Sequence, residues 1–129
     1  MLEKLSLFIN YDGDIDDIAN EISELLGIEL KKEIDEIAEV QRYMFRFLDI
    51  EFVLIDNHEL EDDCGIIFSD YNYELGIIKL YSGKKNDYYD DMYEKMAMFL
   101  MKKLSYSLNA NVMLVDNLQT LVLSTVPAT

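Results

Sequence analysis

The stretch from about Asp87 to Leu108 constrains the fold most, because its apolar residues recur at the spacing of one helix face. The stripe contains Tyr89, Met92, Tyr93, Met96, Phe99, Leu100, Leu104 and Leu108. Asn86 or Asp87 can cap the first turn. A long helix with one apolar stripe has to cover that stripe with another layer of the protein.

Strand patterns elsewhere in the chain can supply that layer. Residues 4–11 alternate in hydrophobicity, and residues 40–57 contain two alternating runs with a tight connection, which predicts antiparallel strands. Residues 65–82 are rich in Ile, Phe and Tyr and predict a further strand, with an interruption near Ser69 and Asp70.

A shorter helix is predicted directly after the first strand. Its apolar positions are Ile15, Ile18, Ile22, Leu25 and Leu26. Asp14 is suited to cap the helix N-terminus, with Asp17 three residues later, and Gly27 stands where a left-handed residue often ends a helix.

Two stretches leave alternatives open. The apolar residues of 28–41 fit either a short helix or a strand with a loop. Residues 111–117 have the pattern of a short buried strand, but 118–124 fit a strand or a helix.

The length of 129 residues, half of them hydrophobic, suffices for one domain with a core and is short for two. We therefore expect a single α+β domain over residues 1–124 and a flexible tail at 125–129. Its mostly antiparallel central sheet is expected to carry the N-terminal helix and the long C-terminal helix on one face.

The composition is strongly acidic, with 26 Asp and Glu residues against 11 Lys and Arg and a formal net charge of −15. This charge repels nucleic acid and phosphate-rich substrates and attracts cationic partners. A basic protein is therefore the expected partner. The alternative is that the acidity only keeps the protein soluble.

The cysteine content and the first residues indicate the cellular compartment in which the protein is expected. The one cysteine, Cys64, cannot close a disulfide within the chain. The first residues lack the basic and long apolar regions of a signal peptide, and no apolar run approaches the ~20 residues that cross a bilayer. We expect a cytoplasmic protein that does not enter a membrane.

The acidic stretch at 11–22 invites comparison with calcium-binding loops. Counted from Asp12, the sixth position requires glycine but holds Asp17, and the twelfth requires glutamate but holds Ser23. Acids at a helix start are explained by the helix dipole. A zinc site requires several histidine or cysteine ligands, and the chain has one histidine and one cysteine. We expect no metal and no other cofactor.

The motifs give no support for an enzyme. His58 and Cys64 could form a nucleophilic pair, but the acids around them disfavour a thiolate. Glu29 and Lys31 form a Glu-x-Lys pair of the kind found in some nucleases, yet no basic patch accompanies them. The glycines are scattered singly, so a phosphate-binding loop is absent from the sequence.

One segment combines acids with tyrosines. From Asp56 to Leu75 there are seven acids and neither lysine nor arginine. Tyrosine beside carboxylate is typical of protein interfaces, because the ring buries area at low entropic cost and the acids pair with basic residues. The alternative is that the tyrosines belong to the core. The candidate partner-binding residues are Asp56, His58, Glu59, Glu61, Asp62, Asp63, Asp70 and Tyr71.

Three runs carry a resemblance to a known family: FVLIDNHELEDDCGIIFSDYNYELGI, YDDMYEKMAMFLMKKLS and VMLVDNLQTLV. Together they resemble the small immunity proteins of bacterial contact-dependent growth inhibition systems. The resemblance implies a non-enzymatic antidote that binds the C-terminal toxin domain delivered by a neighbouring cell and blocks its active site, commonly that of a nuclease. The family offers no catalytic residue to carry over.

Two other functions remain open at this stage. One is a small metal-dependent hydrolase that uses the clustered carboxylates. The other is a nucleic-acid mimic that inhibits an unrelated DNA-binding machine.

Overall fold

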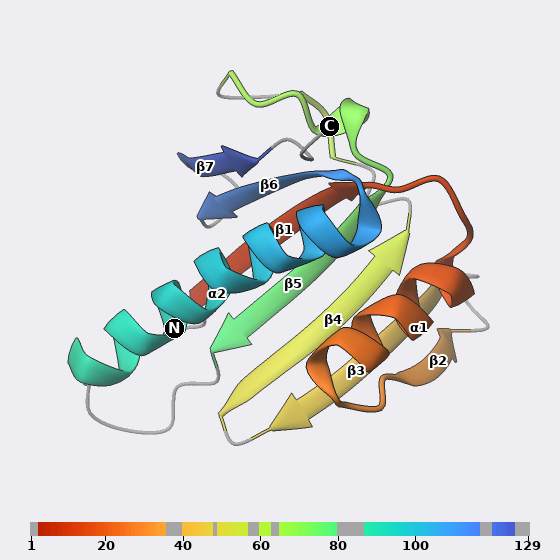
Figure 1. The fold of residues 1–129 in the computed structure, drawn as a ribbon, viewed down its shortest axis with the longest axis horizontal. Helices are drawn as coiled ribbons and strands as arrows, with labels where there is room; N and C mark the ends of the chain where they lie inside the picture. Colours follow the sequence, from red (N-terminus) through yellow and green to blue (C-terminus); the bar gives the residue numbers. More distant parts are fainter. Residues whose placement is uncertain are drawn as a thin grey trace.

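A computed structural model describes residues 3–35, 40–47, 49–56, 60–62, 65–79, 87–116 and 120–125. These residues form one seven-stranded antiparallel sheet with two helices on one of its faces (Figure 1). The α+β class with an N-terminal and a long C-terminal helix is thereby confirmed. No helix in the described part of the chain is long and apolar enough to span a membrane.

The elements follow one another as β1 (Glu3–Asn10), α1 (Ile15–Leu26), β2 (Lys31–Asp35), β3 (Val40–Phe47), β4 (Ile50–Asp56), the 3-10 turn η1 (Phe68–Asp70), β5 (Tyr73–Lys79), α2 (Asp87–Leu108), β6 (Asn111–Asp116) and β7 (Thr120–Thr125). The strand order is β2-β3-β4-β5-β1-β6-β7, so the first strand lies inside the sheet between β5 and β6. The predicted tail overlaps β7 at Thr125, and residues 126–129 lie outside the described residues.

The structure decides between the alternatives that the sequence left open. Within 28–41, β2 and β3 form an antiparallel pair, so the strand interpretation is correct there. In the last ambiguous stretch β7 pairs with β6, again as a strand. β2 and β7 are short strands whose hydrogen bonds depend on a neighbouring strand. A local hydrophobic pattern contains no information about that neighbour.

The termini of α1 follow the sequence signals closely. The Asp14 carboxylate accepts a hydrogen bond of 2.8 Å from the Asp17 amide, which caps the helix. Gly27 ends the helix with φ of 66°, a conformation that glycine adopts without a side-chain clash. Both predictions are confirmed.

The main core lies between the helices and the sheet. From the strands it receives the side chains that point to this face, such as Leu7, Leu54 and Leu75, which are fully buried. From α2 it receives Tyr93, Ala97, Leu100, Met101 and Leu104.

The predicted apolar stripe of α2 was therefore partly wrong. Met92 is 48% exposed and Phe99 is 61% exposed, whereas Ala97 and Met101 are fully buried. A helix that packs on a sheet buries only the side that faces the sheet. Hydrophobic periodicity indicates how wide the apolar side of a helix is, but less well which residues at its edges face the sheet. The side chain of Tyr89 lies outside the described residues.

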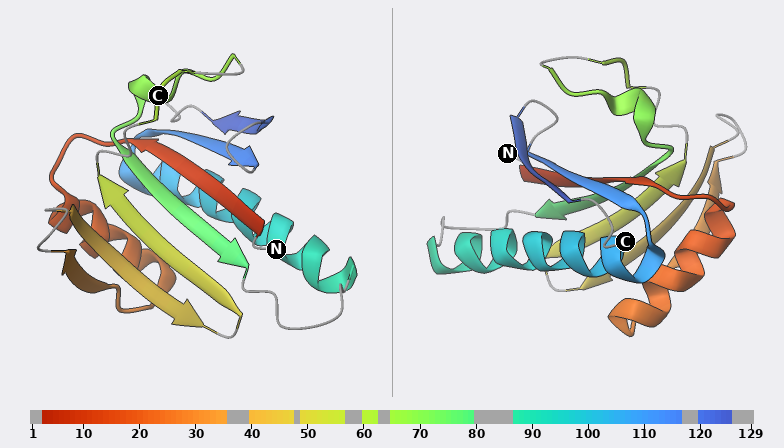
Figure 2. Two further views of the ribbon diagram at one scale, coloured as in Figure 1. Left: turned by 180° about the vertical axis from the view of Figure 1, so that it is seen from behind. Right: turned by 45° about the horizontal axis from the view of Figure 1, so that its top comes forward.

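A second, smaller core lies on the opposite face of the sheet. Phe8 of β1 contacts the ring of Phe68 edge-on at a centroid distance of 4.9 Å. Met113 and Val115 of β6 join it, together with Ile66. Figure 2 shows the segment with η1 over this face, beside β1 and β6. The predicted strand over 65–82 is interrupted where expected, and its regular part begins at Tyr73.

Candidate functional site

The structure separates the predicted partner-binding residues. His58, Glu59 and Asp63 lie outside the described residues, as does Cys64. The five described ones are Asp56, Glu61, Asp62, Asp70 and Tyr71, and they occupy different surroundings.

Asp62 and Tyr71 stabilise the segment that covers the second core. The Asp62 carboxylate accepts hydrogen bonds from the Ser69 amide at 3.0 Å and from the Ser69 hydroxyl at 3.2 Å. Tyr71 is partly buried against the cluster around Phe68. Glu61 and Asp70 are exposed on the same segment. Their surroundings therefore give Asp62 and Tyr71 structural roles.

Asp56 lies at a different place, where three elements meet. It ends β4 and is the direct cross-strand partner of Tyr73, the first residue of β5. Because β1 and β4 both run antiparallel to β5, the ends of β1 and β4 flank the start of β5. The β1–α1 connection and the end of β4 thus lie at one end of the sheet (Figure 1). Asp56 is the last residue of β4.

Hydrogen bonds fix this end of the sheet. The Tyr11 amide donates to the Asn72 side-chain oxygen at 2.9 Å, and the Asn72 side-chain nitrogen donates to the Tyr11 carbonyl at 2.7 Å. The Tyr73 hydroxyl donates to the carbonyl of Gly13. The rings of Tyr11 and Tyr73 meet edge to face at 6.4 Å. A Cβ at Gly13 would lie 2.6 Å from the Tyr11 ring, so this glycine permits the arrangement.

Carboxylates surround these two rings. Burial and the charges of Glu21, Asp17, Asp12 and Asp14 raise the pKa of Tyr11. Burial raises the pKa of Tyr73, and nearby negative charges add to this. We call this site the acidic end; its residues are Tyr11, Asp12, Asp14, Asp17, Glu21, Asp56 and Tyr73.

Three acids of the acidic end remain available to a partner. No ion pair joins any of them to a lysine or arginine in the described part of the chain. Asp12, Asp17 and Glu21 are exposed. The partly exposed Tyr11 phenol is protonated at neutral pH and can donate a hydrogen bond beside this negative charge, whereas the buried Tyr73 hydroxyl already donates to Gly13.

Residues 12–17 were predicted only to begin the helix, and their proximity to Asp56 was not predicted. The missing information was the strand order, because the two segments meet only when β1 and β4 flank β5. Tyr11 and Tyr73 gave a partial signal, since each stands next to acids in the sequence.

Asp16 differs from its neighbours. It accepts a hydrogen bond from the Tyr43 hydroxyl and lies 3.2 Å from the Lys32 ammonium. The hydrogen bond from Tyr43 is the largest cause that lowers the pKa of Asp16, and the bond from Lys32 is the next. Asp16 thus ties α1 to the β2–β3 pair instead of facing a partner.

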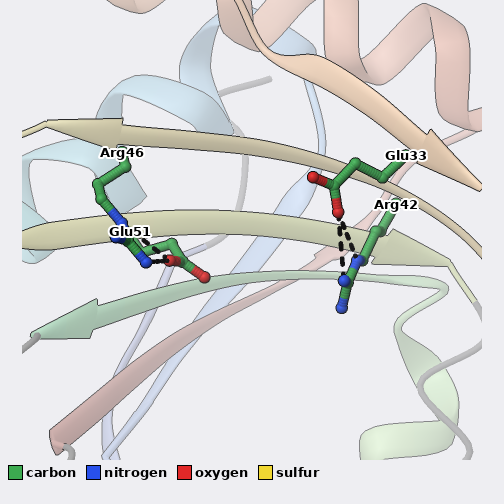
Figure 3. A network of polar contacts seen from close by, with 4 residues as sticks. All are labelled: Glu33, Arg42, Arg46 and Glu51. Atoms are coloured by element: carbon green, nitrogen blue, oxygen red, sulfur yellow. Dashed lines mark hydrogen bonds and ion pairs between the residues drawn. The ribbon is translucent and has the colours of Figure 1, made fainter.

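The opposite face of the sheet has balanced charges. Arg42 lies 3.2 Å from Glu33, and Arg46 lies 2.7 Å from Glu51 (Figure 3). An open depression of about 420 Å³ lies there, lined by Lys31, Glu33, Met44, Phe45, Arg46 and Glu51. Both surfaces include residues of β4. The acidic end carries an excess of negative charge, whereas acids and bases pair on this face.

Among the described residues, the acidic end is a charged surface that is suited to binding a partner. Among them, no three His, Cys, Asp or Glu side chains converge in a way that could hold a metal ion. Comparisons with protein-family models, with curated proteins and with solved structures find no match for this chain.

Proposed function

We propose that this chain is an immunity protein of the contact-dependent growth inhibition type. It binds the C-terminal domain of a cognate toxin, commonly a nuclease, in the cytoplasm of the cell that it protects, and occludes the basic active-site cleft. The resemblance of the sequence to these proteins supports the proposal, as does the net charge of −15. The observation that carries it is the acidic end, where the exposed carboxylates of Asp12, Asp17 and Glu21 form no ion pair with any described lysine or arginine.

The physical basis is competition for a cationic cleft. A nuclease cleft is lined with basic residues that bind phosphates, and a cluster of carboxylates can occupy the same residues. Opposite charges also speed the encounter of the two proteins. Tyr11, which is partly exposed and packs against the buried Tyr73 ring, adds a rigid ring that buries area at little entropic cost.

Co-expression tests this function. The chain should co-purify with the toxin domain encoded by the adjacent upstream gene, protect the cells that express that domain, and inhibit its activity at equimolar amounts. A toxin domain that remains active with excess chain present would contradict the proposal.

Two results would point to the other functions. Metal-dependent hydrolysis by the purified chain alone would favour the hydrolase. Equal inhibition of DNA-binding proteins with no relation to the toxin would favour the nucleic-acid mimic, because such a mimic offers charge without a specific surface.

A further inference from the structure

The described residues cover the sheet face opposite the helices over only part of its width. The second core covers β1 and β6. Over β3, β4 and β5, the outward apolar side chains are Met44, Val53, Ile55 and Ile78, which are partly exposed and belong to neither core. We call this surface, with the ion pairs Glu33–Arg42 and Arg46–Glu51, the open sheet face.

The sequence of β4 does not match a strand with one face in water. Such a strand alternates apolar and polar residues, whereas continuous apolar runs are typical of strands buried on both faces. Residues 52–55 are Phe, Val, Leu and Ile. Phe52 and Leu54 are buried under the helices, and Val53 and Ile55 point to the open sheet face. The composition of β4 is thus that of a strand with a second cover.

The charges on the open sheet face indicate which kind of molecule can cover it. The described side chains there are the bases Lys4, Lys31, Arg42 and Arg46 and the acids Glu33, Glu51 and Glu74. Glu74 is 3.0 Å from Lys4 and its side chain is 4% exposed. Two copies that each carry a net charge of −15 repel one another. This repulsion is weakest when they meet through a face without excess acid. A strongly basic partner, by contrast, is drawn to the acidic end.

The open sheet face is also self-complementary. Met44 is the direct cross-strand partner of Val53, and Arg46 is that of Glu51. A two-fold axis parallel to the strands and between β3 and β4 exchanges these two strands. It places Arg46 of one copy opposite Glu51 of the other and Met44 opposite Val53, in the aligned packing usual for two sheets.

From the uncovered apolar residues, the balanced charge and this register, we propose that a second copy of the chain covers the open sheet face. The result is a two-fold symmetric dimer with the sheets packed face to face. The acidic ends of both copies remain outside the contact. The proposal concerns the chain alone, so its test is independent of the toxin.

Sedimentation velocity of the full chain tests the dimer over a range of concentrations and salt. A species of twice the 15.1 kDa monomer mass is expected, and it should gain population as salt rises, because salt screens the repulsion between acidic copies. A monomer at every concentration and salt would overturn the proposal.

Charge reversal provides the sharper test. Arg46→Glu and Glu51→Arg should each raise the dimer dissociation constant by at least about tenfold, because each places like charges across the two-fold axis. An equimolar mixture of the two variants should form a heterodimer, detected by native mass spectrometry. In that heterodimer both contacts between the copies join opposite charges again, while the pair within each copy stays mismatched.

The mixture therefore separates an intermolecular contact from a structural role within one chain. Absence of the heterodimer from the mixture would overturn the proposal. The matched control is Phe99→Glu, which adds a charge to another exposed apolar site, on α2. This variant should dimerise like the wild type, and dissociation caused by it would place the contact on α2 instead.

Discussion

Asp14, Asp16 and Asp17 lie within one helical turn but have different roles. Asp14 caps α1, Asp16 binds Tyr43 and Lys32, and Asp17 adds charge to the acidic end. Only the first role could be predicted from the sequence, since a cap depends on residues three positions apart. The partner of Asp16 is 27 positions away, and the spacing of acids contains no information about it.

The bond between Tyr43 and Asp16 predicts a dependence of stability on alkaline pH. Hydrogen bonding to Asp16 is the main cause that raises the pKa of Tyr43 from 10.0 to about 12. The protonated phenol is thus favoured by folding, so its contribution is complete below pH 10 and is lost as the pH rises towards 12. Tyr43→Phe should lower the free energy of unfolding at neutral pH by less than about 1 kcal/mol, because the pair is exposed.

Urea unfolding of wild type and Tyr43→Phe at a series of pH values measures this effect. The difference between them should shrink above pH 10. Tyr106→Phe, on the outer side of α2, serves as the control and should change little at any of these pH values. A difference between wild type and Tyr43→Phe that stays constant above pH 10 would contradict the prediction, because it would mean that ionisation of the hydroxyl does not weaken its contribution.

At the scale of elements, α2 shows what hydrophobic periodicity can and cannot predict. The position and length of the helix were predicted correctly, because its pattern extends over many turns. Its rotation was not, since Met92 and Phe99 also fit the stripe but face outward. β2 was ambiguous for another reason: its sequence, KKEID, carries four charges and no clear alternation.

Neighbouring residues on α2 test its orientation. Leu100→Ala should lower the free energy of unfolding by about 2–5 kcal/mol, because it opens a cavity in the main core. Phe99→Ala removes a larger side chain but should change stability by no more than about 0.5 kcal/mol, because the ring is largely exposed. Chemical denaturation of both variants gives the comparison, and a larger loss for Phe99→Ala would reverse the assigned orientation.

At the scale of the whole molecule, the position of the negative charge matters as well as its amount. The triple variant Asp12→Asn, Asp17→Asn and Glu21→Gln changes the acidic end. The control Glu24→Gln, Glu29→Gln and Glu94→Gln changes exposed acids elsewhere. Each neutralises three acids, so −15 becomes −15 + 3 = −12 in both.

Stopped-flow association with the toxin domain should distinguish the two variants. The acidic-end variant should associate several-fold more slowly than the control, and added salt should slow the wild type most, because screening acts over ~8 Å at physiological ionic strength. Equal rates for the two variants would mean that recognition uses another surface. This response to salt is opposite to that expected for the dimer.

The place of β1 in the sheet has a consequence for the order of folding. β1 is made first, but its two neighbours, β5 and β6, come from residues 73–79 and 111–116. β1 therefore has no partner on either side until residues 73–79 have been synthesised, and its second partner follows only with residues 111–116. Pairings this distant in sequence close slowly. The sheet around β1 can thus be completed only after β6 has been synthesised, and a chain truncated before β6 leaves β1 with an open edge that can aggregate.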